Sequence, residues 1–141
     1  MGEARLDLAS LDIGDILPPV SNAPISRTTL ALFAGASNDH NPMHIDIDVA
    51  RAAGMDDVFA QGMLIMAYLG QFLTGRVPQS AIRTFGVRFS AITHLESEIT
   101  CRGKVVDKVE EGGETRVHVD LTATDQVGEV KLIGRAVFAV S

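Results

Sequence analysis

An acid, an amide and two imidazoles lie within six positions of one another, in the segment Asp39-His40-Asn41-Pro42-Met43-His44. A carboxylate and an imidazole held side by side can share a proton and orient a water molecule, because histidine titrates near neutrality. A carboxylate in an apolar pocket shifts toward the same range of pH. The segment therefore predicts acid–base chemistry on a bound water.

Two other interpretations of this segment were weighed. His40 and His44 are four residues apart, as in a helical zinc site, but Pro42 lies between them and interrupts a helix. No Glu follows His40 and no cysteine is near, so we expect no metal. Asp and Asn also stabilise turns through their own backbone, which leaves a purely structural turn as the alternative.

The elements around the segment should hold it between two helices. Ser26 is a suitable N-cap for a helix that runs to about Ala36. Residues 37–46 contain too many turn formers for an ordinary helix. A short helix is expected from Asp48 to Ala53, ending at Gly54.

Residues 62–73 are apolar on nearly every side, and Gly75 and Pro78 follow them. The length of this stretch favours a helix over a strand. Because a helix without a polar face should be buried all round, we expect residues 62–73 to be enclosed by other elements.

The remaining chain has the period of strands. Residues 11–25 predict a first strand and a turn, and residues 84–89, 99–105, 116–121 and 129–140 predict four more strands. Gly112-Gly113 and Gly128 mark turns between the later ones. No helix separates these strands, so they should be antiparallel. The simplest packing is an α+β hot-dog fold, in which a curved antiparallel sheet wraps around one long buried helix; another α+β sandwich is the alternative.

Composition limits the class of protein. The chain has 141 residues, which predicts a single domain over 1–141, and its net charge of −6 argues against a nucleic-acid partner. The one cysteine, Cys101, cannot form an internal disulfide, which suits the reducing cytoplasm. The N-terminus lacks the features of a signal peptide, and no apolar run reaches the roughly 18 residues of a membrane span.

Residues 39–44 resemble the D-x-N-P-x-H signature of the MaoC-like family of R-specific enoyl-CoA hydratases. Phe33-Ala34-Gly35 precedes this signature as aromatic and small residues do in the family, and Gln61-Gly62-Met63 resembles its H-G-M element at the start of the central helix. The chain is also similar to small dehydratase subunits of actinobacterial fatty-acid elongation. The resemblance covers nearly the whole chain.

This resemblance implies roles for four residues. Asp39 and His44 would be the catalytic pair that holds water and moves its proton, and Asn41 would hold the water or the pair in register. The backbone amide of Gly62 would donate to the oxyanion that develops on the thioester, because it opens a helix. The reaction implied is the reversible hydration of a trans-2-enoyl thioester to the (R)-3-hydroxyacyl thioester. No bound cofactor is expected, since the thioester carries coenzyme A or acyl carrier protein.

The sequence departs from the family at Asn38, where Gly is usual, at Gln61, where His is common, and at His40, a variable position. Two alternatives stay open. One is a hot-dog thioesterase, which the absence of Asp and Glu from residues 62–73 disfavours. The other is a non-catalytic or weakly active subunit that shapes the acyl pocket of a heteromeric dehydratase. We expect at least a homodimer, or a heterodimer with a related hot-dog subunit, because a lone domain leaves a sheet edge exposed.

Other polar residues are weaker candidates. His94 and His118 should lie at a strand edge and on a solvent-exposed face, and Cys101 should be core. Four basic residues could meet the phosphates of coenzyme A but fit a solvated strand face better: Arg83, Arg88, Arg102 and Lys104. Three methionines could line an acyl tunnel or fill the core: Met55, Met63 and Met66.

Overall fold

The computed structural model describes residues 6–140, which form one five-stranded sheet and a set of short and long helices. The strands are β1 (Ile16–Ser21), β2 (Ile82–Phe89), β3 (Thr100–Glu111), β4 (Glu114–Thr124) and β5 (Val130–Val140). The helices are α1 (Arg27–Ser37), α2 (Ile47–Ala52) and α3 (Gly62–Thr74), with 3-10 turns at Leu8–Ser10, Pro42–His44 and Gln79–Ala81.

The sheet is antiparallel throughout and runs in the order β1-β3-β4-β5-β2, so β2 and β1 form its two edges. The hairpin between β3 and β4 turns at Gly112 and Gly113, whose φ angles are 62° and 77°. Both glycines are needed there because a two-residue hairpin turn of this kind has positive φ at both central positions. The antiparallel pairing expected for these strands is therefore confirmed.

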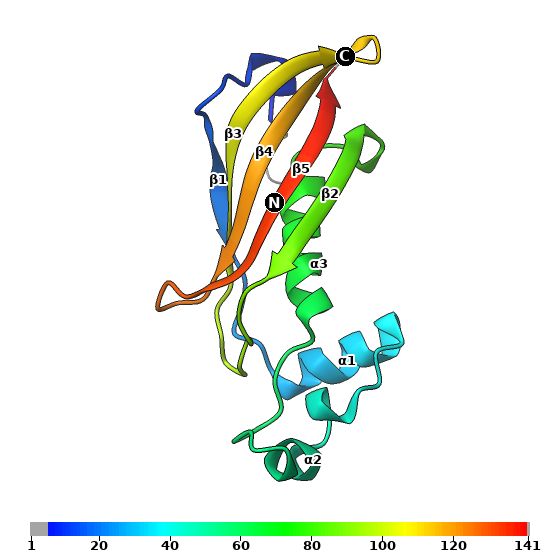
Figure 1. The fold of residues 1–141 in the computed structure, drawn as a ribbon, viewed down its shortest axis with the longest axis vertical. Helices are drawn as coiled ribbons and strands as arrows, with labels where there is room; N and C mark the ends of the chain where they lie inside the picture. Colours follow the sequence, from blue (N-terminus) through cyan, green and yellow to red (C-terminus); the bar gives the residue numbers. More distant parts are fainter. Residues whose placement is uncertain (1–5, 141) are drawn as a thin grey trace.

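The curved sheet packs its inner face against α3, which lies along it (Figure 1). The alternating inward residues of β4, Val117, Val119 and Leu121, are fully buried, and they meet Leu69 and Phe72 of α3 within one core cluster. Burial of side chains of this size stabilises the fold by about 1.5–3 kcal/mol each. The α+β hot-dog fold predicted from the sequence is confirmed.

One expectation about α3 is wrong for the single chain. The helix is buried along Ile65, Leu69 and Phe72, but Met63 is 52% exposed and Ala67 is also exposed. The cause is geometric, because one sheet covers only one side of a helix. The apolar residues on the other side of α3 thus form an uncovered face.

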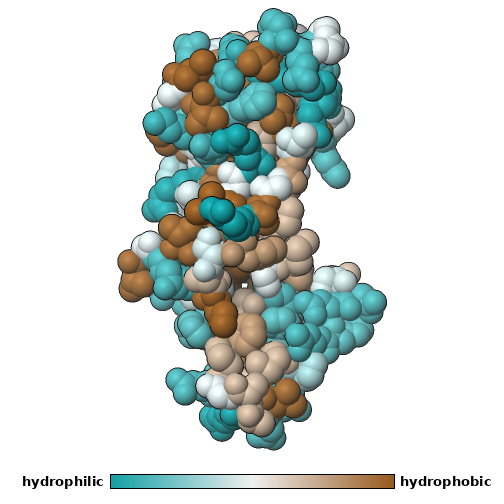
Figure 2. All heavy atoms as spheres, in the orientation of Figure 1, coloured by the Kyte–Doolittle hydropathy of each residue, from teal (hydrophilic) through white to brown (hydrophobic). Residues whose placement is uncertain are grey.

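The helices α1 and α2 lie at one end of the sheet, where the chain between β1 and α3 folds away from it (Figure 1). Figure 2 views the molecule in the same orientation. Apolar side chains run down the middle of the face in view, from the sheet to the helical end. No helix within residues 6–140 is both long and apolar enough to cross a membrane.

Candidate active site

The site loop starts where α1 ends, at Asn38. The N-cap Ser26 begins α1 by accepting a hydrogen bond from the Thr29 amide at 3.1 Å, as the sequence predicted. Asn38 ends the helix with φ 60° and ψ 22°, in the left-handed region. Asparagine adopts this region more readily than most residues, which explains why it can stand where the related family usually has Gly.

Two consecutive side-chain turns then shape the loop. The Asn41 amide donates to Asp39 Oδ1 at 3.2 Å, and the Met43 amide donates to Asn41 Oδ1 at 3.1 Å. Pro42 opens the 3-10 turn that carries His44. One carboxylate oxygen of Asp39 is thereby committed to the backbone. The Asn41 side chain is exposed and caps the 3-10 turn that carries His44.

The other Asp39 oxygen faces His44. Asp39 Oδ2 lies 3.8 Å from His44 Nε2, while the two side chains are 37% and 10% exposed. This distance is too long for a direct hydrogen bond but lets both atoms contact one water oxygen. The carboxylate and the imidazole that the sequence singled out are therefore brought together in space.

The imidazole of His44 is oriented by the main chain of Phe59. His44 Nδ1 lies 2.7 Å from the Phe59 carbonyl oxygen, and the two rings meet edge to face at 5.0 Å. Because a carbonyl oxygen only accepts, Nδ1 carries the proton, and Nε2 of the neutral ring is the acceptor. The tautomer of the neutral ring thus places its acceptor nitrogen on the side of Asp39.

The segment from Phe59 to Gly62 is itself held by neighbouring backbone. Ala60 donates to the Thr93 carbonyl at 2.8 Å, and Phe59 forms an isolated antiparallel bridge with His94. The side chain of Gln61 is fully buried and donates through Nε2 to the Leu30 carbonyl at 2.9 Å. Gln61 therefore ties the start of α3 to α1, in the position where the family commonly has His.

The start of α3 opens into a cavity. Gln61, the N-cap residue, makes no side-chain capping bond, so the first amides of the helix stay available together with its positive dipole end. A cavity of about 350 Å³ lies at this point, and its lining includes His44, Gly62, Ile65, Lys131 and residues 89–93. The predicted oxyanion donor and the predicted base thus share one cavity.

Asp39 borders a second hollow on the other side. A groove of about 410 Å³ follows the uncovered face of α3 and is lined by Phe33, Met63, Met66 and Phe85 beside Asp39. Met63 and Met66 therefore line this groove, while Met55 lines a different hollow, and both Met55 and Met66 also pack against the core. The pair Asp39 and His44 lies between an apolar groove and the cavity at the helix start.

Lys131 is a site residue that sequence reasoning missed. Its side chain is 2% exposed and lines the His44 cavity, although β5 reads as an apolar strand. The available signal was a lysine within an apolar run, closely preceded by the acidic residues Asp125 and Glu129. A buried lysine is rare unless it is paired.

The weaker candidates lie elsewhere. Arg83 bonds Glu114 at 2.7 Å, and Arg102 donates to Thr124 at 2.6 Å, so both belong to strand faces. Cys101 is fully buried, and desolvation raises the pKa of its thiol to about 11. His94 is exposed at the bridge to Phe59. Within residues 6–140, no three His, Cys, Asp or Glu side chains gather to hold a metal ion.

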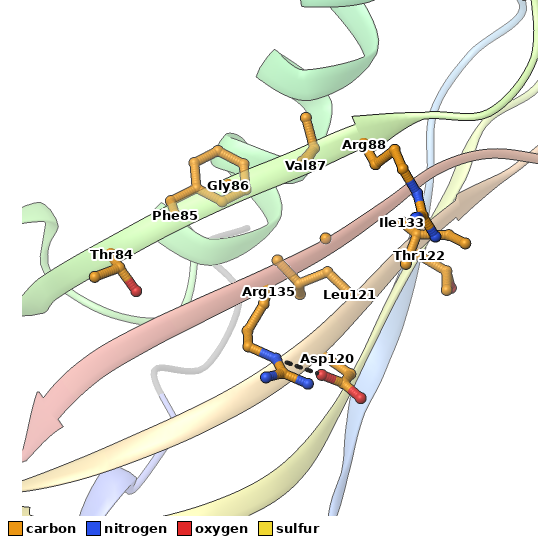
Figure 3. A pocket seen from close by; sticks show the side chains of 11 residues that line it. Thr84, Phe85, Gly86, Val87, Arg88, Asp120, Leu121, Thr122, Ile133 and Arg135 are labelled. Atoms are coloured by element: carbon orange, nitrogen blue, oxygen red, sulfur yellow. Dashed lines mark hydrogen bonds and ion pairs between the residues drawn. The ribbon is translucent and has the colours of Figure 1, made fainter.

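A wider hollow of about 740 Å³ lies over β2, β4 and β5 on the outer face of the sheet. Figure 3 shows Arg135 pointing toward Asp120, and these two side chains form an ion pair at 3.1 Å. No imidazole or thiol is among the described residues that line this hollow. It offers no acid–base pair like that of Asp39 and His44.

The fold defines a hot-dog protein with an acid and an imidazole between two hollows beside its central helix. The chain belongs to the MaoC like domain family, whose match covers residues 12–127. A mitochondrial 3-hydroxyacyl-[acyl-carrier-protein] dehydratase of Arabidopsis thaliana is 26% identical over 89 residues, which are 63% of this chain and 52% of that protein. The chain thus spans about half the length of this relative.

Solved structures share the fold. The R-hydratase PhaJ1 from Pseudomonas aeruginosa superposes with a TM-score of 0.81 at 25% identity, covering 93% of this chain and 83% of that one. The ChsH1-ChsH2 complex from Mycobacterium tuberculosis has a chain with a TM-score of 0.78 at 21% identity, covering 92% of this chain and 98% of that one.

Proposed function

We propose that this protein catalyses the reversible hydration of a trans-2-enoyl thioester to the (R)-3-hydroxyacyl thioester. The observation that carries the proposal is the 3.8 Å separation of Asp39 Oδ2 and His44 Nε2 beside the open start of α3. Membership of the MaoC-like family, and its hydratase and dehydratase relatives, support this class of chemistry in general.

In this mechanism Asp39 and His44 hold one water between them. A proton leaves the water for the pair as the water oxygen bonds to C3, and the π electrons of the C2–C3 double bond move toward the thioester carbonyl. The enolate oxygen accepts a hydrogen bond from the Gly62 amide, which is aligned with the helix dipole. The pair then returns the proton to C2, so that water is added across one face. Dehydration runs through the same steps in reverse.

The same chemistry needs no bound cofactor, because the acidity of C2 comes from the thioester itself. The substrate carries coenzyme A or acyl carrier protein, and the apolar groove of Phe33, Met63 and Met66 suits an acyl group. We propose that residues 1–141 act as one domain in the cytoplasm.

We propose that the active form is at least a dimer. The uncovered face of α3, with Met63 52% exposed, lies next to the free edge strand β2, whose Phe89 is 51% exposed. A second hot-dog chain would cover both, because proteins usually cover exposed apolar faces and sheet edges. The ChsH1-ChsH2 complex shows that a chain of this fold can assemble with a different chain. A monomeric mass of an active preparation in solution would contradict this assembly.

The experiment is an absorbance assay of enoyl loss with trans-2-enoyl thioesters of graded length, starting from crotonyl-CoA. We expect saturable hydration, and the 3-hydroxy product should be the R enantiomer by chiral chromatography. Activity on none of these thioesters, alone or mixed with a related hot-dog subunit, would overturn the proposal. Activity only in the mixture would favour the alternative of a pocket-shaping subunit. Release of free thiol without enoyl loss would indicate a thioesterase.

A further inference from the structure

Lys131 lines the His44 cavity, and its side chain is almost completely buried. Its Nζ donates to the Ile92 carbonyl at 2.7 Å, forms an ion pair with Glu129, and lies 3.5 Å from Asp125 Oδ2. An ammonium has three donors, and three acceptors surround this one. Burial of a charge is tolerated here because it is fully paired.

The acids that hold Lys131 are fixed by the turn between β4 and β5. Asp125 Oδ1 accepts hydrogen bonds from the amides of Val127 at 3.1 Å and Glu129 at 2.8 Å, which leaves Oδ2 for the ammonium. The Asp125 side chain is 11% exposed. The turn and the Ile92 carbonyl therefore form one hydrogen-bonded unit around the buried Lys131 side chain.

This unit is connected to His44 through main-chain contacts. Lys131 holds the carbonyl of Ile92, and the next carbonyl, of Thr93, accepts the Ala60 amide at 2.8 Å. The residue before Ala60 is Phe59, whose carbonyl lies 2.7 Å from His44 Nδ1. Each step is one hydrogen bond or one peptide unit long.

We infer that Lys131 is a positioning residue for the proposed hydratase reaction. Its buried ammonium anchors residues 90–94, and these residues fix the Phe59 carbonyl that sets the tautomer and orientation of His44. The expected effect of Lys131 on turnover rests on the proposed function. Its expected effect on the orientation of the His44 ring does not. A methionine at this position would fill the space of the lysine without holding Ile92.

The test compares Lys131→Met, and Lys131→Met combined with Asp125→Asn, with wild type. The double variant removes the lysine without leaving the Asp125 charge buried and unpaired. Asp125→Asn alone is its matched control, and Arg135→Met is a control for losing an exposed cation from β5, since Arg135 is 67% exposed. Circular dichroism and the NMR signals of the backbone amides in the sheet verify that each variant is folded.

The first readout is nitrogen NMR of the His44 ring, which does not depend on activity. We expect wild type to show one tautomer protonated at Nδ1, and the Lys131 variants to show a mixture or exchange broadening. Folded Lys131 variants with an unchanged His44 spectrum would overturn the inference. If neither variant folds, native-state hydrogen exchange of the wild type is measured instead. An Ala60 amide that exchanges much faster than the sheet amides would also overturn the inference.

The second readout is turnover of an enoyl thioester. We expect kcat of the Lys131 variants to fall about 10- to 100-fold with little change in KM, since small misplacements of a reacting group have effects of this size. Lys131→Arg should recover part of the loss, and Arg135→Met should lose nothing. A changed His44 spectrum in a protein that hydrates no enoyl thioester would reject the proposed function while the positioning role stands.

Discussion

The ring of Phe89 lies directly over the Cα atom of Gly62. A Cβ atom on Gly62 would be 2.8 Å from Phe89 Cε1 and 2.9 Å from Cδ1, closer than such contacts occur. Strand β2 thus ends against the start of α3, and a side chain at position 62 would fit only if the Phe89 ring moved. Gly62 and Phe89 both line the cavity at the start of α3.

Gly62→Ala should therefore reduce activity without unfolding the protein. Phe89 is 51% exposed and can turn away, so the added methyl group should change the free energy of unfolding by no more than about 1 kcal/mol. The methyl group should still keep the thioester oxygen from the amide and lower kcat/KM about 10²–10³-fold, the loss seen for an oxyanion donor. Steady-state kinetics measures this effect. The double variant Gly62→Ala with Phe89→Leu is the control. If it were fully active, crowding by the Phe89 ring, and not a blocked amide at position 62, would explain the low activity of Gly62→Ala.

Asp39→Asn and His44→Gln should each lower turnover about 10²–10⁴-fold, because each removes one half of a general acid–base pair. Thermal unfolding should change little for Asp39→Asn, since an asparagine oxygen can still accept from the Asn41 amide. Exposed His40→Gln is the matched control and should keep full activity. Near-normal hydration of crotonyl-CoA by either site variant would contradict the assignment.

The Cys101 thiol should make the fold less stable in alkaline solution. Desolvation raises the pKa of this thiol from 9.0 to about 11, against the opposing effect of Arg76 and Arg102. Between these values the unfolded chain releases the proton and the folded chain keeps it, so the free energy of unfolding falls as pH rises from 9 to 11. Denaturant titrations at several pH values measure the slope. Cys101→Ala should have a shallower slope over the same interval, and an identical slope would contradict the prediction.

Ser26→Ala should destabilise the protein through the start of α1. The variant loses the acceptor for the Thr29 amide, which is typically worth about 1 kcal/mol at an N-cap. For a domain of this size that corresponds to a decrease in Tm of about 3–5 °C. Differential scanning calorimetry measures the shift, with exposed Ser80→Ala as the control. Equal melting of the two variants would show that the cap contributes nothing.

Local sequence signals predicted most of the fold. Ser26 as a cap, the turn formers of 37–46 and the alternation of Val117 and Val119 each depend on nearby residues, and the structure agrees with them. The burial of α3 was overestimated, because the composition of a helix does not say how many sides its own chain covers. Met63 is apolar and nevertheless exposed in the single chain.

The site was predictable in its side chains but not in its main-chain contacts. The types and spacing of Asp39 and His44 indicated a shared water, and the structure brings them within 3.8 Å. The Phe59 carbonyl that orients His44 has no sequence signature, because every residue carries one. Lys131 escaped notice although Asp125 and Glu129 closely precede it, because the Ile92 carbonyl becomes its neighbour only after folding.

The hydrogen bonds that hold His44, Lys131 and the segment leading into α3 end largely on main-chain atoms, namely the carbonyls of Leu30, Phe59, Ile92 and Thr93. A carbonyl survives every substitution that leaves the chain path unchanged. Side chains around the hollows can therefore be exchanged during evolution, altering which acyl group fits, while the imidazole keeps its place. Related proteins with this scaffold can therefore keep the same reaction while their substrates change.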